Sequence, residues 1–371
     1  MAQSPPRERK CVSGMNYCKR QWIGAAGLKV ALVAAVAVAA GCGGNDGLSP
    51  SEELPATAAP AATDSTAVPL DSTLLPVDST GLVPDSAAGI TTMSALAAGT
   101  QPGIVFGSWF MSISDLTTVH NGSVQGGTLS PSNILSFLAG ARAKGARVVI
   151  KLCKGRDSYV QNADGTFSFT KWKALVDQYK GVNLTPYITD GTILGHFLID
   201  EPALARRWGG KVIPQATLEA MAAYSRQLWP GMTTFARVSA IWLANSPVIY
   251  RHLDAGWLQY AHGKGDAVKL VAAEVAAARS KGLGLVVGLN VLDGGNGSSG
   301  IRGTYSGRYA MSASEIRSYG TALLNQSHSC GFYNWTYNYF GPTYYSRPDI
   351  KSALSELSTK ARNHVRTSCR Q

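Results

Sequence analysis

The chain has 371 residues, with 34 basic and 23 acidic side chains and a formal net charge of +11. This basic balance makes nucleic acid the first partner to consider, but the sequence has no helix-turn-helix, zinc-finger spacing, RNP-like strand or run of five Lys or Arg. We therefore expect no nucleic-acid partner.

Residues 1–42 predict an export segment. Basic residues precede an apolar run from Val30 to Ala40, which is too short to span a bilayer comfortably and ends in small residues. The sequence Ala39-Ala40-Gly41-Cys42 resembles the lipobox of bacterial lipoproteins, which implies a lipid anchor on Cys42. The other interpretation is an ordinary secretory signal with an unrelated cysteine. Either way we expect an exported protein, and the lipobox implies a membrane-anchored lipoprotein on the cell surface or in the periplasm.

Residues 43–100 predict a disordered linker. Ser, Thr, Ala, Pro and Gly dominate, and the segment holds seven acidic residues and no Lys or Arg. Such a segment cannot bury a core, and its like charges repel one another. A short, irregular Pro-x-Asp-Ser repeat fits a spacer better than a solenoid.

Residues 101–371 alternate apolar strand patterns with amphipathic helix patterns, which favours a parallel sheet covered by helices. The predicted strands are Ile104–Met111, Arg147–Leu152, Ile193–Asp200, Thr233–Val238, Trp257–Tyr260, Gly284–Leu292 and Gly331–Tyr337. The predicted helices are Ser132–Lys144, Lys171–Lys180, Gln215–Leu228, Asp266–Lys281, Ser312–Asn325 and Pro348–Arg362. This pattern predicts an α/β fold, a (β/α)8 TIM-type barrel, with the eighth strand short or hidden around Ser239–Leu243. A doubly wound sheet is the second choice, because no Gly-rich phosphate loop follows an early strand.

The folded region is more basic than the whole chain. The export segment holds six basic residues and one acidic residue, and the linker holds seven acidic residues, so residues 101–371 keep 28 basic and 15 acidic residues and a net charge of +13. One interpretation is a solvated basic surface. The other is a field that attracts an anionic polysaccharide.

Three cysteines lie in the folded region, namely Cys153, Cys330 and Cys369. In an exported protein a disulfide between Cys330 and Cys369 would tie the C-terminal tail to the barrel. Cys153 is then expected to be a buried thiol.

The residues that follow each strand form the rim of such a barrel. Glu201 and Asp200 end the run Phe197-Leu198-Ile199-Asp200-Glu201-Pro202, and we take Glu201 as the catalytic candidate. Aromatic, amide and charged side chains around it would suit sugar rings, although each tryptophan has core packing as its other interpretation. The candidate substrate-binding residues are Trp109, Lys151, Arg237, Gln259, Tyr260, Asn290, Trp335 and Tyr337.

The run from Phe197 to Pro202 resembles the strand-four signature of clan A TIM-barrel glycoside hydrolases, in which Asn-Glu-Pro carries the acid/base glutamate. The resemblance implies that the third strand counted here is the fourth of the barrel and that Glu201 is the acid/base. The domain is also similar to exported bacterial lipoproteins of uncharacterised activity that share Asp-Glu-Pro and Leu-Asn-x-Leu-x-Gly-Gly elements. This chain departs from the family pattern in two ways: Asp200 replaces the asparagine, and no glutamate ends a late strand.

A glycosidase needs a second carboxylate. The remaining glutamates of the domain fall in predicted helices, so Asp293 is our first choice, with Asp157 and Asp200 behind it; Asp293 also fits a turn residue in its Gly-rich loop. The sequence therefore predicts a surface-anchored glycoside hydrolase that acts on polysaccharide, or a non-catalytic glycan-binding lipoprotein on the same scaffold. A lyase or esterase lacks an identifiable base. His spacing predicts no metal site, and no cofactor motif is present.

Overall fold

The structure is a computed structural model that describes residues 102–337, 341–365 and 368–370. The predicted export segment, the lipid anchor at Cys42 and the predicted linker lie outside the described residues. Among the described helices, none is long and apolar enough to cross a membrane.

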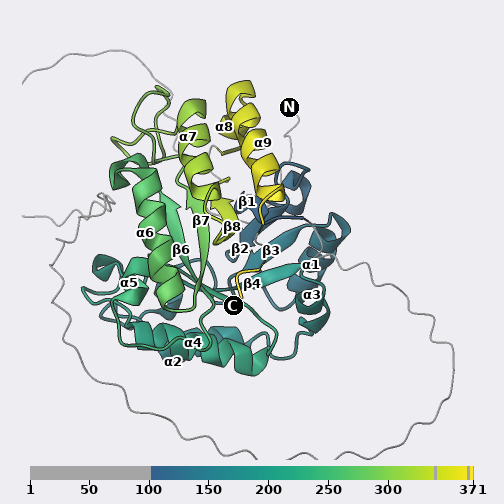
Figure 1. Cartoon of the computed structure of the whole chain (residues 1–371). Helices are drawn as coiled ribbons and strands as arrows, with labels where there is room; N and C mark the ends of the chain where they lie inside the picture. Colours follow the sequence, from purple (N-terminus) through teal and green to yellow (C-terminus); the bar gives the residue numbers. More distant parts are fainter. Residues whose placement is uncertain (1–101, 338–340, 366–367, 371) are drawn as a thin grey trace, which may run out of the picture. The chain divides into compact units, whose positions relative to one another are not determined.

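The described strands close into a parallel barrel in which each strand pairs with the next in sequence and β8 pairs with β1. Figure 1 shows the helices arranged around these strands. The strands are β1 (Val105–Trp109), β2 (Gly122–Gln125), β3 (Arg147–Ile150), β4 (Ile193–Asp200), β5 (Thr234–Arg237), β6 (Ala255–Tyr260), β7 (Gly284–Leu289) and β8 (Ser329–Asn334). The predicted (β/α)8 barrel is confirmed, and the run that ends at Asp200 is its fourth strand.

The position expected for the missing strand was wrong. Ser239–Leu243 belongs largely to the short helix α5 (Ala240–Ala244), whereas the missing strand is β2. Its sequence, Gly-Ser-Val-Gln, has one apolar side chain and no strand-like alternation. It is a strand because its backbone completes the hydrogen-bonded ladder between β1 and β3.

The six predicted helices are present; two have the predicted ends and the other four differ by one to three residues. They are α1 (Ile134–Ala143), α2 (Phe169–Asp177), α4 (Gln215–Leu228), α6 (Ala267–Ser280), α7 (Ala313–Leu324) and α9 (Pro348–Arg362). The short helices α3 (Thr185–Thr189), α5 and α8 (Gly341–Tyr345) were not predicted. Ser312 and Glu315 form a capping box at the start of α7.

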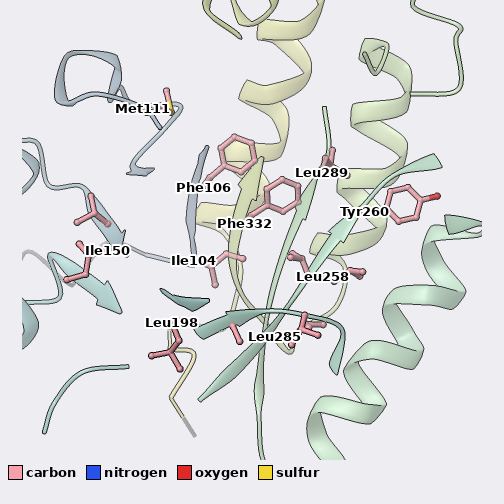
Figure 2. Close-up of a cluster of buried hydrophobic side chains, with 14 of the residues drawn as sticks. Ile104, Phe106, Met111, Ile150, Leu198, Leu258, Tyr260, Leu285, Leu289 and Phe332 are labelled. Carbon is pink, nitrogen blue, oxygen red and sulfur yellow. The ribbon is translucent and has the colours of Figure 1, made fainter. Parts of the chain in front are cut away.

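Side chains of the strands alternate between two apolar layers. One layer lies between the strands and the helices, and Figure 2 shows part of it, with the rings of Phe106 and Phe332 side by side. The other fills the barrel and includes Trp109, Val149, Phe197, Trp257 and Tyr333. Since successive residues of a strand face opposite sides, this division decides which side chains reach the barrel mouth.

The C-terminal tail packs at the amino-terminal end of the barrel. Cys369 forms the expected disulfide with Cys330, with a Cα–Cα distance of 4.9 Å. The Cys369 carbonyl oxygen lies against Gly284, the first residue of β7. A Cβ atom added to this glycine would be 2.6 Å from that oxygen and would clash with it. The free thiol of Cys153 is buried, as expected, and burial raises its pKa.

Candidate active site

Glu201 lies immediately after β4 and has a left-handed backbone, with φ of 46°. Its amide donates to the Arg237 carbonyl at 3.1 Å, and its own carbonyl accepts from the buried Trp208 indole at 2.9 Å. A non-glycine residue in this region of φ/ψ space is uncommon, and strained residues of this kind cluster at functional sites. These backbone contacts hold Glu201 at the carboxyl-terminal rim of the barrel, where TIM barrels build their active sites.

Two arginines connect Glu201 with Asp200. Nη1 of Arg207 donates to Asp200 and to Glu201, at 2.8 Å in each case. Arg237, the last residue of β5, pairs through Nε with Asp200 and through Nη2 with Glu201, the latter at 3.2 Å. Arg207 also binds Asp157 through its Nε and Nη2 atoms. Three carboxylates and two guanidinium groups therefore form one network, which we call the acid–arginine cluster (Asp157, Asp200, Glu201, Arg207 and Arg237).

Asp200 and Glu201 differ in their exposure within this cluster. The Asp200 side chain is 8% exposed, whereas that of Glu201 is 36% exposed. Burial alone would raise the pKa of Asp200, but Arg237 and Arg207 together hold it well below its usual range. Asp200 is thus a fixed buried anion that holds the two arginines, and Glu201 is the more accessible carboxylate.

Tryptophan rings lie beside the cluster, as the sequence predicted. The Arg237 guanidinium is 5.6 Å from the Trp335 ring centre and 5.9 Å from that of Trp109. The two indoles contact each other edge to face at 5.1 Å. Trp109 is nevertheless buried in the barrel layer, so it serves as core as well as rim, while Trp335 is only partly buried.

Lys151 and Gln259 also point into the barrel near its mouth. The Lys151 ammonium lies 5.9 Å from the Phe197 ring centre and stabilises the charge on Asp200. Both amide atoms of the buried Gln259 side chain lack a partner among the described residues, and so does the Trp109 indole nitrogen. Unpaired buried donors and acceptors of this kind are rare in native proteins and fit the hydroxyl groups of a ligand.

Asp293 does not belong to the acid–arginine cluster. Its carboxylate accepts from the Thr304 hydroxyl and from the Tyr305 amide at 3.0 Å. Its amide donates to the Asn290 side chain at 3.3 Å, so the expected rim residue Asn290 also helps to shape this loop. These contacts match the turn-residue interpretation of Asp293, because both carboxylate oxygens hold the segment that follows β7.

Two predicted substrate-binding residues face away from the cluster. Tyr260 alternates with Gln259 along β6, so its ring packs in the outer layer against Tyr319 at 4.9 Å, and its hydroxyl donates to the Gly265 carbonyl. The Tyr337 ring packs against Tyr345 of α8 at 5.3 Å. Successive residues at a strand end face opposite sides of the barrel wall, so only some of them reach the mouth.

The sequence did not identify Arg207 or Trp208. Both follow the Asp-Glu-Pro sequence within a short 3-10 turn, Ala205–Arg207, and its C-cap. An arginine a few residues after Asp200 and Glu201 could have indicated an ion pair. Arg206 and Arg207 both have this position, and only the fold shows that Arg207 pairs with the acids. His196 of β4 is a hydrogen-bonded core residue, because Nδ1 pairs with the Ser225 hydroxyl at 2.9 Å.

In the described part of the chain, no group of three or more His, Cys, Asp or Glu side chains is arranged to hold a metal ion.

A cavity of about 560 Å³ lies at the amino-terminal end of β2 and β3, since Asn121 and Ala146 precede these strands. Its lining includes Leu116, Thr118, His120, Asn121, Lys144 and Arg362.

No protein-family model and no curated protein matches the sequence. Solved structures do resemble it. An endo-beta-1,4-mannanase from Thermotoga petrophila has a TM-score of 0.46 and 12% identity, over 72% of this chain and 78% of that chain. A beta-glucanase from Saccharophagus degradans has a TM-score of 0.47 and 9% identity, over 70% and 88%. A GH10 xylanase from Bispora sp. MEY-1 has a TM-score of 0.45 and 10% identity, over 71% and 98%.

Proposed function

We propose that the chain is a glycoside hydrolase that acts on an extracellular or cell-wall polysaccharide, with Glu201 as general acid/base. The observation that carries this proposal is the placement of Glu201: it follows β4 directly in a left-handed conformation, within the acid–arginine cluster, whose Arg237 lies beside Trp109 and Trp335. Carboxylates and indole faces together suit sugar rings, whose hydroxyls need charged or polar partners and whose C–H faces stack on aromatic rings.

In this proposal Glu201 donates its proton to the leaving glycosidic oxygen, and a second carboxylate attacks the sugar or activates water. Asp157 is our choice for that second group, because it shares Arg207 with Glu201, whereas both oxygens of Asp293 hold a loop. Asp200 stays ionised and positions the arginines. For Glu201 to act as the acid, substrate binding must separate its Oε2 atom from Arg207, so that this oxygen can carry the proton that passes to the leaving group.

A non-catalytic glycan-binding protein is the second candidate. Two observations favour it: each oxygen of Glu201 is paired with a guanidinium group, and Asn290, not a glutamate, follows β7. A carboxylate held in this way binds polar ligands without proton transfer. The unpaired Gln259 amide and Trp109 indole would then serve affinity alone.

Turnover of a panel of neutral and acidic polysaccharides by residues 101–371 separates these functions. For the hydrolase we expect Glu201→Gln to lower kcat by about 10²- to 10⁴-fold while sugar binding is retained. Glu356→Gln is the matched control, because Glu356 pairs with Arg317 on the outer helices. Full turnover in Glu201→Gln would refute the acid/base role. Absence of any product from the wild-type domain, together with unchanged affinity in Glu201→Gln, would favour the binding protein.

The cellular setting of the activity is also part of the proposal. Anchoring through a lipid on Cys42, with residues 43–100 as a spacer, would place the barrel at a bacterial surface or in the periplasm. The net charge of +13 on residues 101–371 favours an anionic polysaccharide. Incorporation of radiolabelled palmitate into the full-length chain, and its loss in Cys42→Ala, tests the anchor.

A further inference from the structure

Arg147 is buried at the amino-terminal end of the barrel. It is the first residue of β3, and it alternates with Val149 and Lys151 along the face that points into the barrel. The residue as a whole is 4% exposed. A charged group at this depth is normally paired, because transfer of an unpaired ion from water into a protein interior is very unfavourable.

Among the described residues, Arg147 has no such partner. Its Nε and Nη2 atoms are buried, and neither has a hydrogen-bond partner among the described residues. These two N–H groups form one edge of the guanidinium plane, and the same edge of Arg207 holds Asp157 with two parallel hydrogen bonds. The corresponding edge of Arg147 is therefore an unused two-donor fork with an uncompensated positive charge.

A third buried donor lies in the same part of the barrel. Tyr333 of β8 is fully buried, and its hydroxyl has no partner among the described residues. In the strand register Tyr333 pairs with Gly107, Gly107 with Gly122, and Gly122 with Arg147. The two residues between them have no side chain. A Cβ atom on Gly122 would lie 3.2 Å from the Tyr333 ring, so this ring already covers the glycine.

The electrostatics of the pair agree with this proximity. Burial lowers the pKa of Arg147 and raises the pKa of Tyr333, and the Arg147 charge partly offsets the rise for Tyr333. Two hydrogen-bond donors and one hydroxyl, with a net positive charge, are what a small anion requires. We propose that Arg147 and Tyr333 bind a small monovalent inorganic anion of about the size of chloride inside the amino-terminal half of the barrel.

The bound anion would neutralise Arg147 and accept from its Nε–H and Nη2–H groups and from the Tyr333 hydroxyl. Its role is structural, because the proposed catalytic residues lie at the opposite end of the strands. The tail that carries Cys369 packs at this same end of the barrel, against the start of β7. Anion binding at this site is therefore expected to change the stability of the domain, and its measurement does not depend on the proposed hydrolase activity.

Thermal unfolding of residues 101–371 in sodium chloride, with sodium gluconate keeping the ionic strength constant, tests the proposal. Gluconate serves as the reference because it is a much larger anion than chloride. We expect chloride at several times its Kd to raise the Tm of the wild-type domain by about 2 to 4 °C relative to gluconate. Arg147→Met should abolish this shift, Tyr333→Phe should reduce it, and the control Arg279→Met, at an exposed position on α6, should keep it. An equal shift in Arg147→Met would overturn the proposal.

Bromide soaked into crystals of the wild-type domain gives a second measurement that needs no variant. The proposal expects an anomalous peak within hydrogen-bond distance of Arg147 Nε and Nη2. Density for water alone beside this edge, in crystals where bromide occupies other sites, would overturn it. This readout also decides the question if Arg147→Met does not fold.

Discussion

Asp200→Asn is expected to destabilise the domain strongly, because the substitution removes one charge from the centre of the acid–arginine cluster. The asparagine side chain has nearly the same size, so packing is preserved while two guanidinium groups lose their common buried anion. Breaking a buried ion pair by removal of one partner costs about 3 to 5 kcal/mol. At about 2 to 4 °C per kcal/mol for a domain of this size, the Tm should fall by roughly 6 to 20 °C.

Urea unfolding at pH 7, followed by circular dichroism, measures this loss. Asp349→Asn is the matched control, since Asp349 pairs with Arg347 at 3.4 Å and its side chain is 51% exposed; exposed pairs contribute about 0 to 1 kcal/mol. The sign with pH follows from the depressed pKa of Asp200. Its contribution is complete above the unfolded pKa of about 3.9 and is lost as pH falls through the folded pKa. A loss below about 1 kcal/mol in Asp200→Asn would refute the view that Asp200 holds the arginines.

Two further predictions concern stability away from the rim. Burial lowers the pKa of His120 to about 4, so the wild-type domain should lose up to about 3 kcal/mol as pH falls from 6.5 to 4, at about 1.4 kcal/mol per unit. His120→Phe keeps a ring in the stack with Phe106 and Tyr345 and should remove this part of the pH dependence of unfolding; parallel pH curves would contradict the assignment. Cys369→Ser should lower the free energy of unfolding by about 2 to 4 kcal/mol, because the disulfide closes a sequence separation of 39 residues, and equal stability of the oxidised wild type and the variant would contradict this.

Most of the barrel was predictable because local patterns and tertiary demands agree. β4 and the helices α4 and α9 begin and end at the predicted residues. The capping box at Ser312 and the burial of His196 were also predictable, since each depends on a short sequence pattern. β2 was not, because a four-residue strand with one apolar residue owes its conformation to backbone pairing with β1 and β3.

The position of Glu201 in the candidate site was predictable, but the residues that contact it were not. The strand end at Glu201 could be found because an apolar run stops at two carboxylates. The face on which Tyr260 lies depends on the register of β6. A shift of one residue would move this side chain to the opposite face, and the sequence does not decide between the two registers. The role of Asp293 depends on Thr304 and Tyr305, which come from a loop with no regular pattern.

The sequence by itself determined the alternation of strands and helices and the position of one glutamate at the rim of a barrel. Only the tertiary structure decided that Arg207 and Arg237 pair with Asp200 and Glu201, and that Arg147 meets no acid among the described residues. The physical reason is that hydrophobic periodicity reports which face of an element is buried, whereas the partner of a buried charge is set by closure of the barrel. That closure brings together side chains that lie tens or hundreds of residues apart, and no local pattern encodes their distance.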